Sequence, residues 1–325
     1  MVFNDILDNN DIPQNDILNP FSGSSASGKH VVHSYSGGAA KAVGLFQSAK
    51  VCIERKEKPT MIVGTSSGSL VAPIVAASYI YPDLIDKAIQ FAETLDVIDM
   101  FPYVGNKPFT KGGKIPLSAK LRALTGHNHL GWQDIRPLYK KVFKDIHLTA
   151  LKESGIKCFS FSVLGKNGMP EFNFLNNAKS VDELIDLIER SSRITPIVQN
   201  KDGRIDGGFI SFSPGMWVLD KDAKNIKEYI AIYSHPIKVG IGTNKNWDDN
   251  IFSVAQRMIE ITTYYLGYKD AKIEELICEK HGIQYTRIEC PDGIVDEIYE
   301  DDDHQLIAFG KASREAAILA IQKHV

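Results

Sequence analysis

A short apolar run that meets a Gly-x-Ser-x-Gly pentapeptide constrains the fold of this chain more than any other stretch. Residues 60–63 (Thr-Met-Ile-Val) form the run, residues 64–68 (Gly-Thr-Ser-Ser-Gly) form the pentapeptide, and an apolar helical pattern follows at 70–79. This order is typical of a nucleophile elbow, in which a serine occupies a sharp turn between a strand and a helix. Gly64 and Gly68 would leave room for close packing around the turn. We therefore predict that Ser66 lies above a sheet edge, beside free helix amides.

Strand-like and helix-like segments alternate along the rest of the chain. Strands are expected at 30–35, 156–163, 228–233, 237–241 and 284–289. Helices are expected at 42–53, 83–95, 132–143, 180–190, 252–266 and 313–321, and Pro73 is expected to kink or end the helix after the elbow. Such alternation favours a mostly parallel sheet covered by helices on both faces. We predict one three-layer α/β/α domain over residues 30–325.

The first 29 residues are expected to lie outside this domain. An imperfect Asn-Asp-Ile repeat occurs three times before a Ser/Gly-rich run at 22–28. Such a composition is typical of a flexible, solvated tail. The alternative is a tether whose Ile and Leu side chains bind another protein.

Composition narrows the functional classes. A formal net charge of −3 gives no basis for a nucleic-acid partner. The cysteines are far apart and lack metal-ligand spacing, which predicts reduced thiols in a cytoplasmic protein (Cys52, Cys158, Cys278 and Cys290). The sequence shows neither a bilayer-spanning stretch nor the pattern of a signal peptide.

Two further motifs need an explanation together with the elbow. Gly37 and Gly38 lie between the first expected strand and the first expected helix, where free backbone N–H groups can bind an oxyanion or a phosphate. Much later, Asp206 is followed by Gly207 and Gly208. A serine needs a base to remove its proton, and acyl transfer also needs donors for the oxyanion. Taken alone, the glycine pair is equally consistent with an ordinary turn, and Asp-Gly-Gly is a common turn signal.

Taken together and in this order, the motifs resemble those of the patatin-like phospholipases. That family carries a Gly-Gly-Gly-x-Arg/Lys-Gly loop, a Gly-x-Ser-x-Gly elbow and a later Asp-Gly-Gly/Ala. The corresponding stretches here are residues 37–42 (Gly-Gly-Ala-Ala-Lys-Ala), 64–68 and 206–208, with a similar closing helix at 309–317. The resemblance implies a patatin-like three-layer domain over about 29–325.

The resemblance also implies a mechanism and a class of substrate. Ser66 would attack a carboxyl ester, and Asp206 would take its proton, so that a Ser/Asp dyad forms an acyl-enzyme without histidine, metal or cofactor. Because an aspartate with a pKa of about 3.9 is a weak base, much of the catalysis would fall to the oxyanion donors. These would be the backbone N–H groups of Gly37, Gly38, Ala39 and Ser67. The substrates would be phospholipids or lysophospholipids, acted on by a cytoplasmic protein that also associates with membranes.

Some residues depart from the family pattern. Ala39 and Ala42 replace glycines in the oxyanion loop, and a positive φ would strain an alanine there. Phe212 and Ser213 stand where an asparagine is expected before Pro214. Lys41 matches the basic position of the loop, and would either steady the loop, face a lipid phosphate or be solvated.

Three points stay open at this level. An α/β-hydrolase with a Ser-Asp-His triad is the first alternative, because His235, His281 and His304 follow Asp206 in the chain. A binding or assembly protein on a patatin-like scaffold is the second. Aromatic rings and lysines are mixed at 100–122, which predicts either a lipid-facing rim beside Ser66 or a loop that packs its rings inward.

Overall fold

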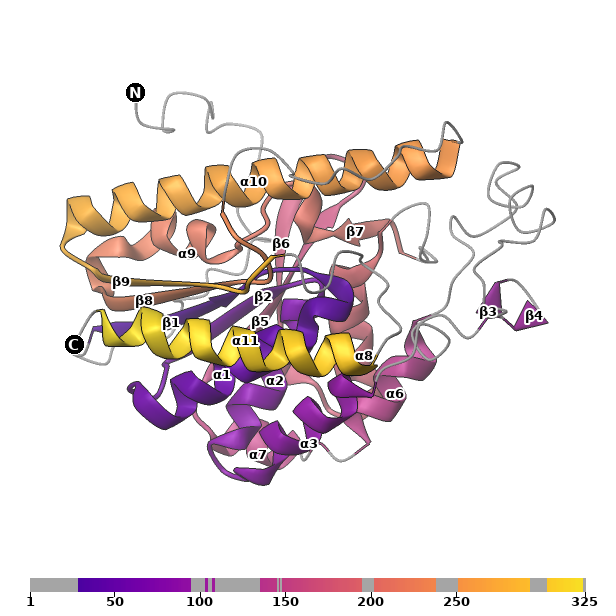
Figure 1. Cartoon of the computed structure of the whole chain (residues 1–325), viewed down its shortest axis with the longest axis horizontal. Helices are drawn as coiled ribbons and strands as arrows, with labels where there is room; N and C mark the ends of the chain where they lie inside the picture. The colour runs from indigo at the N-terminus through magenta and orange to yellow at the C-terminus, as the bar shows by residue number, and fades with distance from the viewer. Residues whose placement is uncertain are drawn as a thin grey trace.

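A central sheet with helices on both faces organises the chain (Figure 1). The computed structural model describes residues 29–94, 103–104, 107–108, 135–144, 146, 148–194, 202–237, 251–292 and 303–323. The main sheet has the strand order β6-β5-β2-β1-β8-β9, and β7 also pairs with β5. Its strands are β1 (His30–Tyr35), β2 (Met61–Thr65), β5 (Lys157–Leu164), β6 (Met169–Phe174), β7 (Arg204–Asp206), β8 (Ile226–Tyr233) and β9 (Gln284–Glu289). A separate two-stranded ladder pairs β3 (Tyr103–Val104) with β4 (Lys107–Pro108).

The predicted parallel core of the sheet is confirmed, with an antiparallel addition at one edge. β9, β8, β1, β2 and β5 are parallel neighbours. β6 and β7 both pair with β5 in the antiparallel direction. The carboxyl ends of the parallel strands therefore meet along one edge, where open α/β sheets bind their ligands.

Helices cover the two faces of the sheet unequally (Figure 1). One face carries α1 (Ala42–Arg55), α2 (Ser67–Ser78), α3 (Asp83–Glu93), α6 (Arg136–Phe143), α7 (Leu148–Glu153), α8 (Val181–Glu189) and α11 (Asp303–Gln322). The other carries α9 (Gly215–Asp222) and α10 (Ile251–His281). Strand β8 supplies both cores in alternation, since Ile230 and Ile232 face the first and Tyr229 and Tyr233 the second.

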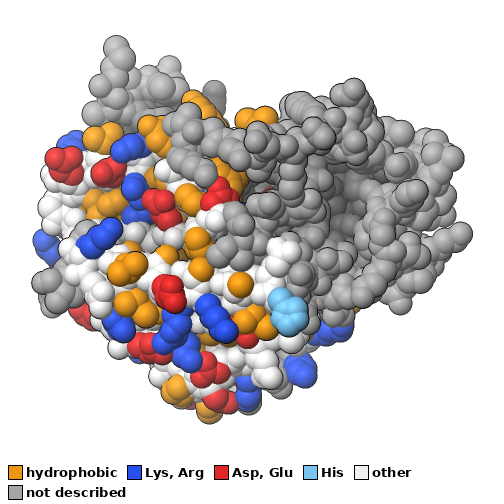
Figure 2. Space-filling view, in the orientation of Figure 1, with side chains coloured by type: hydrophobic (Ala, Val, Ile, Leu, Met, Phe, Trp, Pro, Cys, Tyr) orange, Lys and Arg blue, Asp and Glu red, His pale blue; other side chains and the backbone are white. Residues whose placement is uncertain are grey.

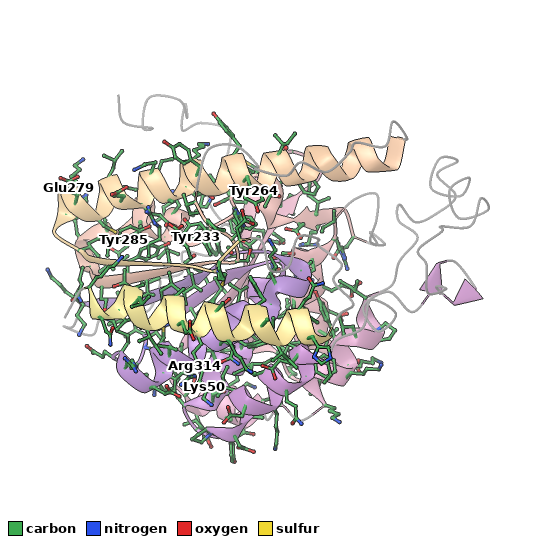
Figure 3. All side chains as sticks on the ribbon, viewed as in Figure 1. Lys50, Tyr233, Tyr264, Glu279, Tyr285 and Arg314 are labelled. Atoms are coloured by element: carbon green, nitrogen blue, oxygen red, sulfur yellow. The ribbon has the colours of Figure 1, made fainter. Side chains whose placement is uncertain are left out.

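The surface of the first layer is mixed in character. On the face in Figure 2, acidic, basic and apolar side chains are interspersed over the described elements. Lys50 of α1 pairs with Asp86 of α3, and Arg314 of α11 pairs with Glu54 of α1 at 2.9 Å (Figure 3). These exposed pairs join neighbouring helices, and each is expected to stabilise the fold by less than about 1 kcal/mol.

Several predicted boundaries need correction. Helix α2 continues through Pro73 to Ser78, so of the two effects predicted for this proline the end of the helix is wrong. Helix α10 runs to His281, well beyond the predicted end at residue 266. Ile237 lies outside any strand, and the rest of the strand predicted at 237–241 falls outside the described residues.

Other predictions also fall outside the described residues. These are the tail before residue 29, and the stretch at 100–122 apart from the backbone of β3 and β4. Within the described part of the chain, no helix combines the length and the apolar character that crossing a membrane requires. The four cysteines are all buried and unpaired (Cys52, Cys158, Cys278 and Cys290).

Two carboxyl side chains of α10, those of Asp270 and Glu274, are buried on the side of the helix that packs on the domain. Asp270 accepts hydrogen bonds from the backbone N–H of Phe212 at 2.6 Å and of Ser213 at 3.0 Å. One turn later, Glu274 accepts hydrogen bonds from the hydroxyls of three tyrosines of the sheet (Tyr229, Tyr233 and Tyr285). Figure 3 shows Tyr233 and Tyr285 beneath the helix. The two bonds to Asp270 fix the positions of Phe212 and Ser213, in the segment that follows Asp206-Gly207-Gly208.

Replacing Asp270 with alanine should lower the free energy of unfolding by about 3 kcal/mol, because two buried backbone N–H groups lose their acceptor. Denaturant unfolding followed by circular dichroism would measure this loss. Asp220→Ala is the matched control, since Asp220 is exposed on α9 and its removal should change stability by less than about 0.5 kcal/mol. Equal losses in the two variants would contradict a bracing role for Asp270.

Candidate active site

The predicted elbow forms between β2 and α2. Ser66 has φ 53° and ψ −121°, a backbone conformation that few residues other than glycine adopt. A Cβ atom at Gly64 would come within 2.1 Å of the Gly68 oxygen, and one at Gly68 within 2.2 Å of the Tyr35 oxygen. Because backbone atoms cannot move aside, both positions require glycine.

Two serines hold this strained turn. The Ser66 N–H donates to Ser191 Oγ at 2.9 Å, and the Ser66 carbonyl accepts from the Ser69 N–H at 3.0 Å and from Ser69 Oγ at 2.5 Å. Strain of this kind persists only where the surroundings fix it, and it is typical of functional sites. The strain therefore singles out Ser66 as a functional candidate.

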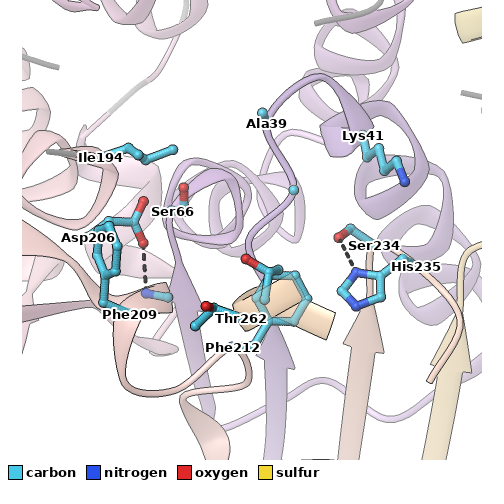
Figure 4. Close-up of a pocket in the computed structure, with 13 residues that line it drawn as sticks. Ala39, Lys41, Ser66, Ile194, Asp206, Phe209, Phe212, Ser234, His235 and Thr262 are labelled. Atoms are coloured by element: carbon cyan, nitrogen blue, oxygen red, sulfur yellow. Dashed lines mark hydrogen bonds between the residues drawn. The ribbon is translucent and has the colours of Figure 1, made fainter. Parts of the chain in front are cut away.

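Asp206 meets Ser66 because β2 and β7 approach each other end to end along β5. Thr65, the last residue of β2, pairs with Phe161, and Asp206, the last residue of β7, pairs with the next residue, Ser162. The strands run in opposite directions, so both carboxyl ends point at the same spot. Figure 4 shows the Ser66 hydroxyl and the Asp206 carboxylate facing each other there.

The surroundings of Asp206 change its acidity. The side chain is 4% exposed, and burial raises its pKa to about 6 against the opposing effects of the Gly208 N–H and the Ser66 hydroxyl. Oδ1 accepts the Gly208 N–H at 2.7 Å. Oδ2 has no hydrogen bond of standard geometry among the described residues. Because its pKa is raised, the Asp206 carboxylate is a stronger base than a solvated aspartate. The neighbouring Gly207 is required as well, because a Cβ there would lie 2.4 Å from the Phe161 oxygen.

The glycine loop after β1 lies directly over the elbow. A Cβ at Gly37 would lie 3.1 Å from Ser66 Cβ. Gly38 has φ 154° and Ala39 has φ 45°, so the left-handed conformation foreseen as a problem for an alanine does occur at Ala39. Ala42, in contrast, has φ −54° and begins α1, so its replacement of a glycine brings no strain. Lys41 is buried, and Figure 4 shows its side chain extending away from Ser66.

Replacing Ala39 with glycine should raise the free energy of unfolding by about 0.5–1 kcal/mol. The left-handed backbone costs an alanine about 1–2 kcal/mol, part of which returns as the greater freedom of glycine in the unfolded chain. Denaturant midpoints of both proteins would measure this gain. Ala42→Gly is the matched control and should lower stability by about 1 kcal/mol or more, because that alanine is helical and buried. A loss in Ala39→Gly would show that the loop carries no strain.

One pocket collects these groups. It encloses about 110 Å³ (Figure 4). Its lining includes six of the predicted residues: Gly38, Ala39, Lys41, Ser66, Asp206 and Gly208. Gly37 and Ser67 are their chain neighbours but do not line it. The remaining wall consists of Ile194, Phe209, Phe212, Ser234, His235, Thr262 and Thr263.

Sequence reasoning missed the part that Ser191 and Ser234 play, and assigned His235 only to the alternative triad. Ser234 and His235 directly follow β8, so the rule that parallel strands end at one edge could have pointed to them. Of the three late histidines, His235 lines the pocket, whereas His281 and His304 do not. Within the described residues, no cluster of three or more His, Cys, Asp or Glu side chains could hold a metal ion.

A protein-family model and solved structures both match this chain. A family model described as patatin-like phospholipase matches residues 34–215, a span that contains the glycine loop, the elbow and Asp206. Among solved structures, VipD from Legionella pneumophila is similar at 14% sequence identity and a TM-score of 0.49. That match covers 91% of this chain and 67% of VipD. Comparison with curated proteins gave no match.

Proposed function

Because the chain belongs to the patatin-like phospholipase family, we propose that it is a lipid acyl hydrolase whose dyad is Ser66 and Asp206. The observation that carries the proposal is the meeting of the two side chains in one pocket, with Ser66 on a strained elbow and Asp206 buried against it. A serine activated by an adjacent base is the general requirement for nucleophilic acyl transfer.

The chemistry would follow two half-reactions. Ser66 Oγ bonds to the ester carbonyl carbon while its proton passes to Asp206, and the tetrahedral intermediate breaks its bond to the alcohol oxygen. The alcohol leaves with the proton from Asp206. Asp206 then takes a proton from a water molecule as the water oxygen bonds to the carbonyl carbon of the acyl-enzyme. The second tetrahedral intermediate breaks its bond to Ser66 Oγ, Asp206 returns the proton to that oxygen, and the fatty acid is released. Each step uses groups of this chain and water.

The negative charge of the intermediate would be held by backbone donors. Gly38 and Ala39 line the pocket beside Ser66, and the N–H of Ser67 begins helix α2. The helix dipole adds a favourable partial charge at this end. In sites of this kind, loss of one such donor costs about 10²–10³ in rate.

The geometry favours a dyad over a Ser-Asp-His triad. The Asp206 carboxylate itself faces Ser66, in the position that a triad gives to histidine. The His235 ring instead packs against Phe212 in a tilted arrangement, at 4.6 Å between ring centroids, and its Nδ1 lies 3.4 Å from Ser234 Oγ. His235→Asn should therefore keep measurable activity, whereas a triad would lose it.

The walls of the pocket suggest an acyl substrate. Ile194, Phe209 and Phe212 surround the dyad with apolar surface, which suits a fatty acyl chain. We extend the proposal to phospholipids and lysophospholipids as substrates, and to a cytoplasmic protein acting at membrane surfaces. The mixed aromatic and basic stretch at 100–122 stays a predicted lipid-facing rim.

Mass spectrometry of lipids would test the function. The full chain is incubated with mixed phospholipid vesicles, with and without prior treatment with a fluorophosphonate ester. Free fatty acids and lysophospholipids should accumulate in the untreated sample, and chelation of calcium should not change their amounts. Absence of products from every phospholipid and short-chain ester, together with absence of fluorophosphonate labelling, would instead favour a binding or assembly protein.

A further inference from the structure

The end of β8 lies next to the oxyanion loop. Strand β8 pairs in parallel with β1, with Ile232 opposite Tyr35. The Ser36 N–H donates to the Ile232 carbonyl at 3.0 Å, and the Ser234 N–H donates to Ser36 Oγ at 2.9 Å. Ser234 is fully buried at this edge. These bonds fix its side chain relative to the loop that follows β1.

Ser234 controls the direction of one peptide group. Its Oγ donates to the Gly37 carbonyl at 2.5 Å, and Ser36 Oγ donates to the same oxygen at 3.0 Å. In a planar trans peptide, the carbonyl of one residue and the N–H of the next point in opposite directions. Holding the Gly37 carbonyl toward Ser234 therefore turns the Gly38 N–H to the opposite side.

Gly38 and Ser234 are also packed against each other. A Cβ atom at Gly38 would lie 2.4 Å from Ser234 Oγ. With its φ of 154°, this position requires glycine twice over, for its backbone conformation and for the space that Ser234 occupies. The serine thus determines both the shape and the direction of the loop here.

His235 in turn orients the serine. Because the single proton of Ser234 Oγ goes to the Gly37 carbonyl, a hydrogen bond at 3.4 Å between His235 Nδ1 and this oxygen needs the proton on Nδ1. The imidazole is 3% exposed and lies against Phe212 and Tyr264, at centroid distances of 4.6 and 4.1 Å. These two aromatic contacts hold the His235 ring in place. The hydrogen bonds that run from His235 through Ser234 to the Gly37 carbonyl strengthen one another.

We propose that Ser234, oriented by His235, is a positioning residue that turns the Gly38 N–H toward the pocket as an oxyanion donor. The proposal rests on the proposed function for the role of that donor. The orientation of the Gly37–Gly38 peptide itself can be measured without any catalytic turnover.

Nuclear magnetic resonance can observe this peptide selectively. Labelling glycine with carbonyl ¹³C and amide ¹⁵N yields correlated signals from Gly–Gly peptides alone, which in this sequence end at Gly38, Gly113 and Gly208. Gly113→Ala and Gly208→Ala identify the two reference signals. In Ser234→Ala the Gly38 signal should move by more than both references, and in Ser234→Thr, which keeps the hydroxyl, it should stay near its original position.

Kinetics of ester hydrolysis form the second readout. Ser234→Ala should lower kcat by about 10-fold to 100-fold with little change in KM, because an oxyanion donor acts in the transition state. Ser234→Thr should recover most of this loss. His235→Phe, which keeps the ring contacts but removes the donor, should lower kcat more than His235→Asn. Ser78→Ala is the matched control, since it deletes a buried hydroxyl bonded to the Ile74 carbonyl at 2.7 Å on α2.

The outcomes separate the two proposals. A wild-type chain that hydrolyses no ester would defeat the proposed function. An unmoved Gly38 signal in Ser234→Ala would overturn the positioning role whether or not any ester is hydrolysed. A moved signal with unchanged kcat would also overturn it, because the peptide orientation would then not matter to the reaction.

Discussion

Replacing Ser66 with alanine should reduce ester hydrolysis to the background rate, a loss of about 10⁴-fold or more. Alanine removes the hydroxyl that is proposed to bond the acyl group, so the acyl-enzyme cannot form and only the slower direct attack of water remains. Initial rates on short-chain esters and on phospholipid vesicles would measure the loss. Covalent labelling by a fluorophosphonate, read as an intact-mass increase, should disappear with it.

Two controls make this result specific. Ser78→Ala, at the other end of the same helix α2, should keep both hydrolysis and labelling. The unfolding midpoint of Ser66→Ala should equal or exceed that of the wild type. Such a midpoint would show that the variant is folded, so misfolding would not be the cause of the lost activity. Hydrolysis that persists in Ser66→Ala would overturn the proposed mechanism, because the acyl-enzyme would have to form on another residue.

Local packing explains why the elbow could be predicted from the sequence. The turn is built within a few consecutive residues, and each of its glycines is required because a Cβ atom there would come within 2.1 or 2.2 Å of a backbone oxygen. A requirement of this kind is visible in the sequence, because only glycine fits these positions and the turn fixes their spacing from the serine. The family followed from this motif together with the glycine loop and Asp-Gly-Gly, the three-layer fold followed from the alternation of strands and helices, and both are confirmed.

The arrangement around Asp206 could be predicted only in part. The Asp-Gly-Gly motif identified the residue, but no pattern in the sequence indicated that β2 and β7 meet end to end along β5. Strand β6, which carries Pro170, showed no pattern that predicted it. Its antiparallel pairing depends on contacts with β5 that no local periodicity reports.

Helix α10 is longer than the sequence predicted. The predicted helix ended at residue 266, directly before Gly267, yet the helix continues to His281. A Cβ at Gly267 would lie 3.2 Å from the Phe212 ring and 3.3 Å from His235 Nε2. The glycine therefore allows a close approach between the helix and the wall of the pocket. Ser191 could not be predicted, because an isolated serine has no pattern that reports its partner. The place of Ser234 directly after β8 could have indicated its position at the sheet edge, but not its bond to the Gly37 carbonyl.

The reaction should also depend on pH through Asp206, whose buried carboxyl has a pKa raised to about 6. The base is active when ionised, so kcat/KM should rise with pH up to about 6 and then level off. At pH 5 the rate should be about tenfold below the plateau. A profile of initial rates from acidic to mildly alkaline pH would measure this midpoint. A flat profile would show that the ionisation of Asp206 does not limit the reaction.

Asp206→Asn should separate activity from stability, because the amide keeps the shape and the bond from the Gly208 N–H but cannot accept the serine proton. Hydrolysis should fall by about 10³-fold or more.

The stability of this variant should depend on pH differently from that of the wild type. The raised pKa of Asp206 means that the folded wild type binds a proton more tightly than the unfolded chain does. The stability from this site is therefore present below about pH 4 and is lost as the pH rises through about 6. Asparagine avoids that loss. Its advantage in free energy of unfolding should therefore grow by up to about 3 kcal/mol between about pH 4 and about pH 7, as unfolding curves at both pH values would show. A variant that is inactive and more stable at neutral pH is the expected result, whereas an Asp206→Asn variant that stays active would mean that another group takes the proton from Ser66.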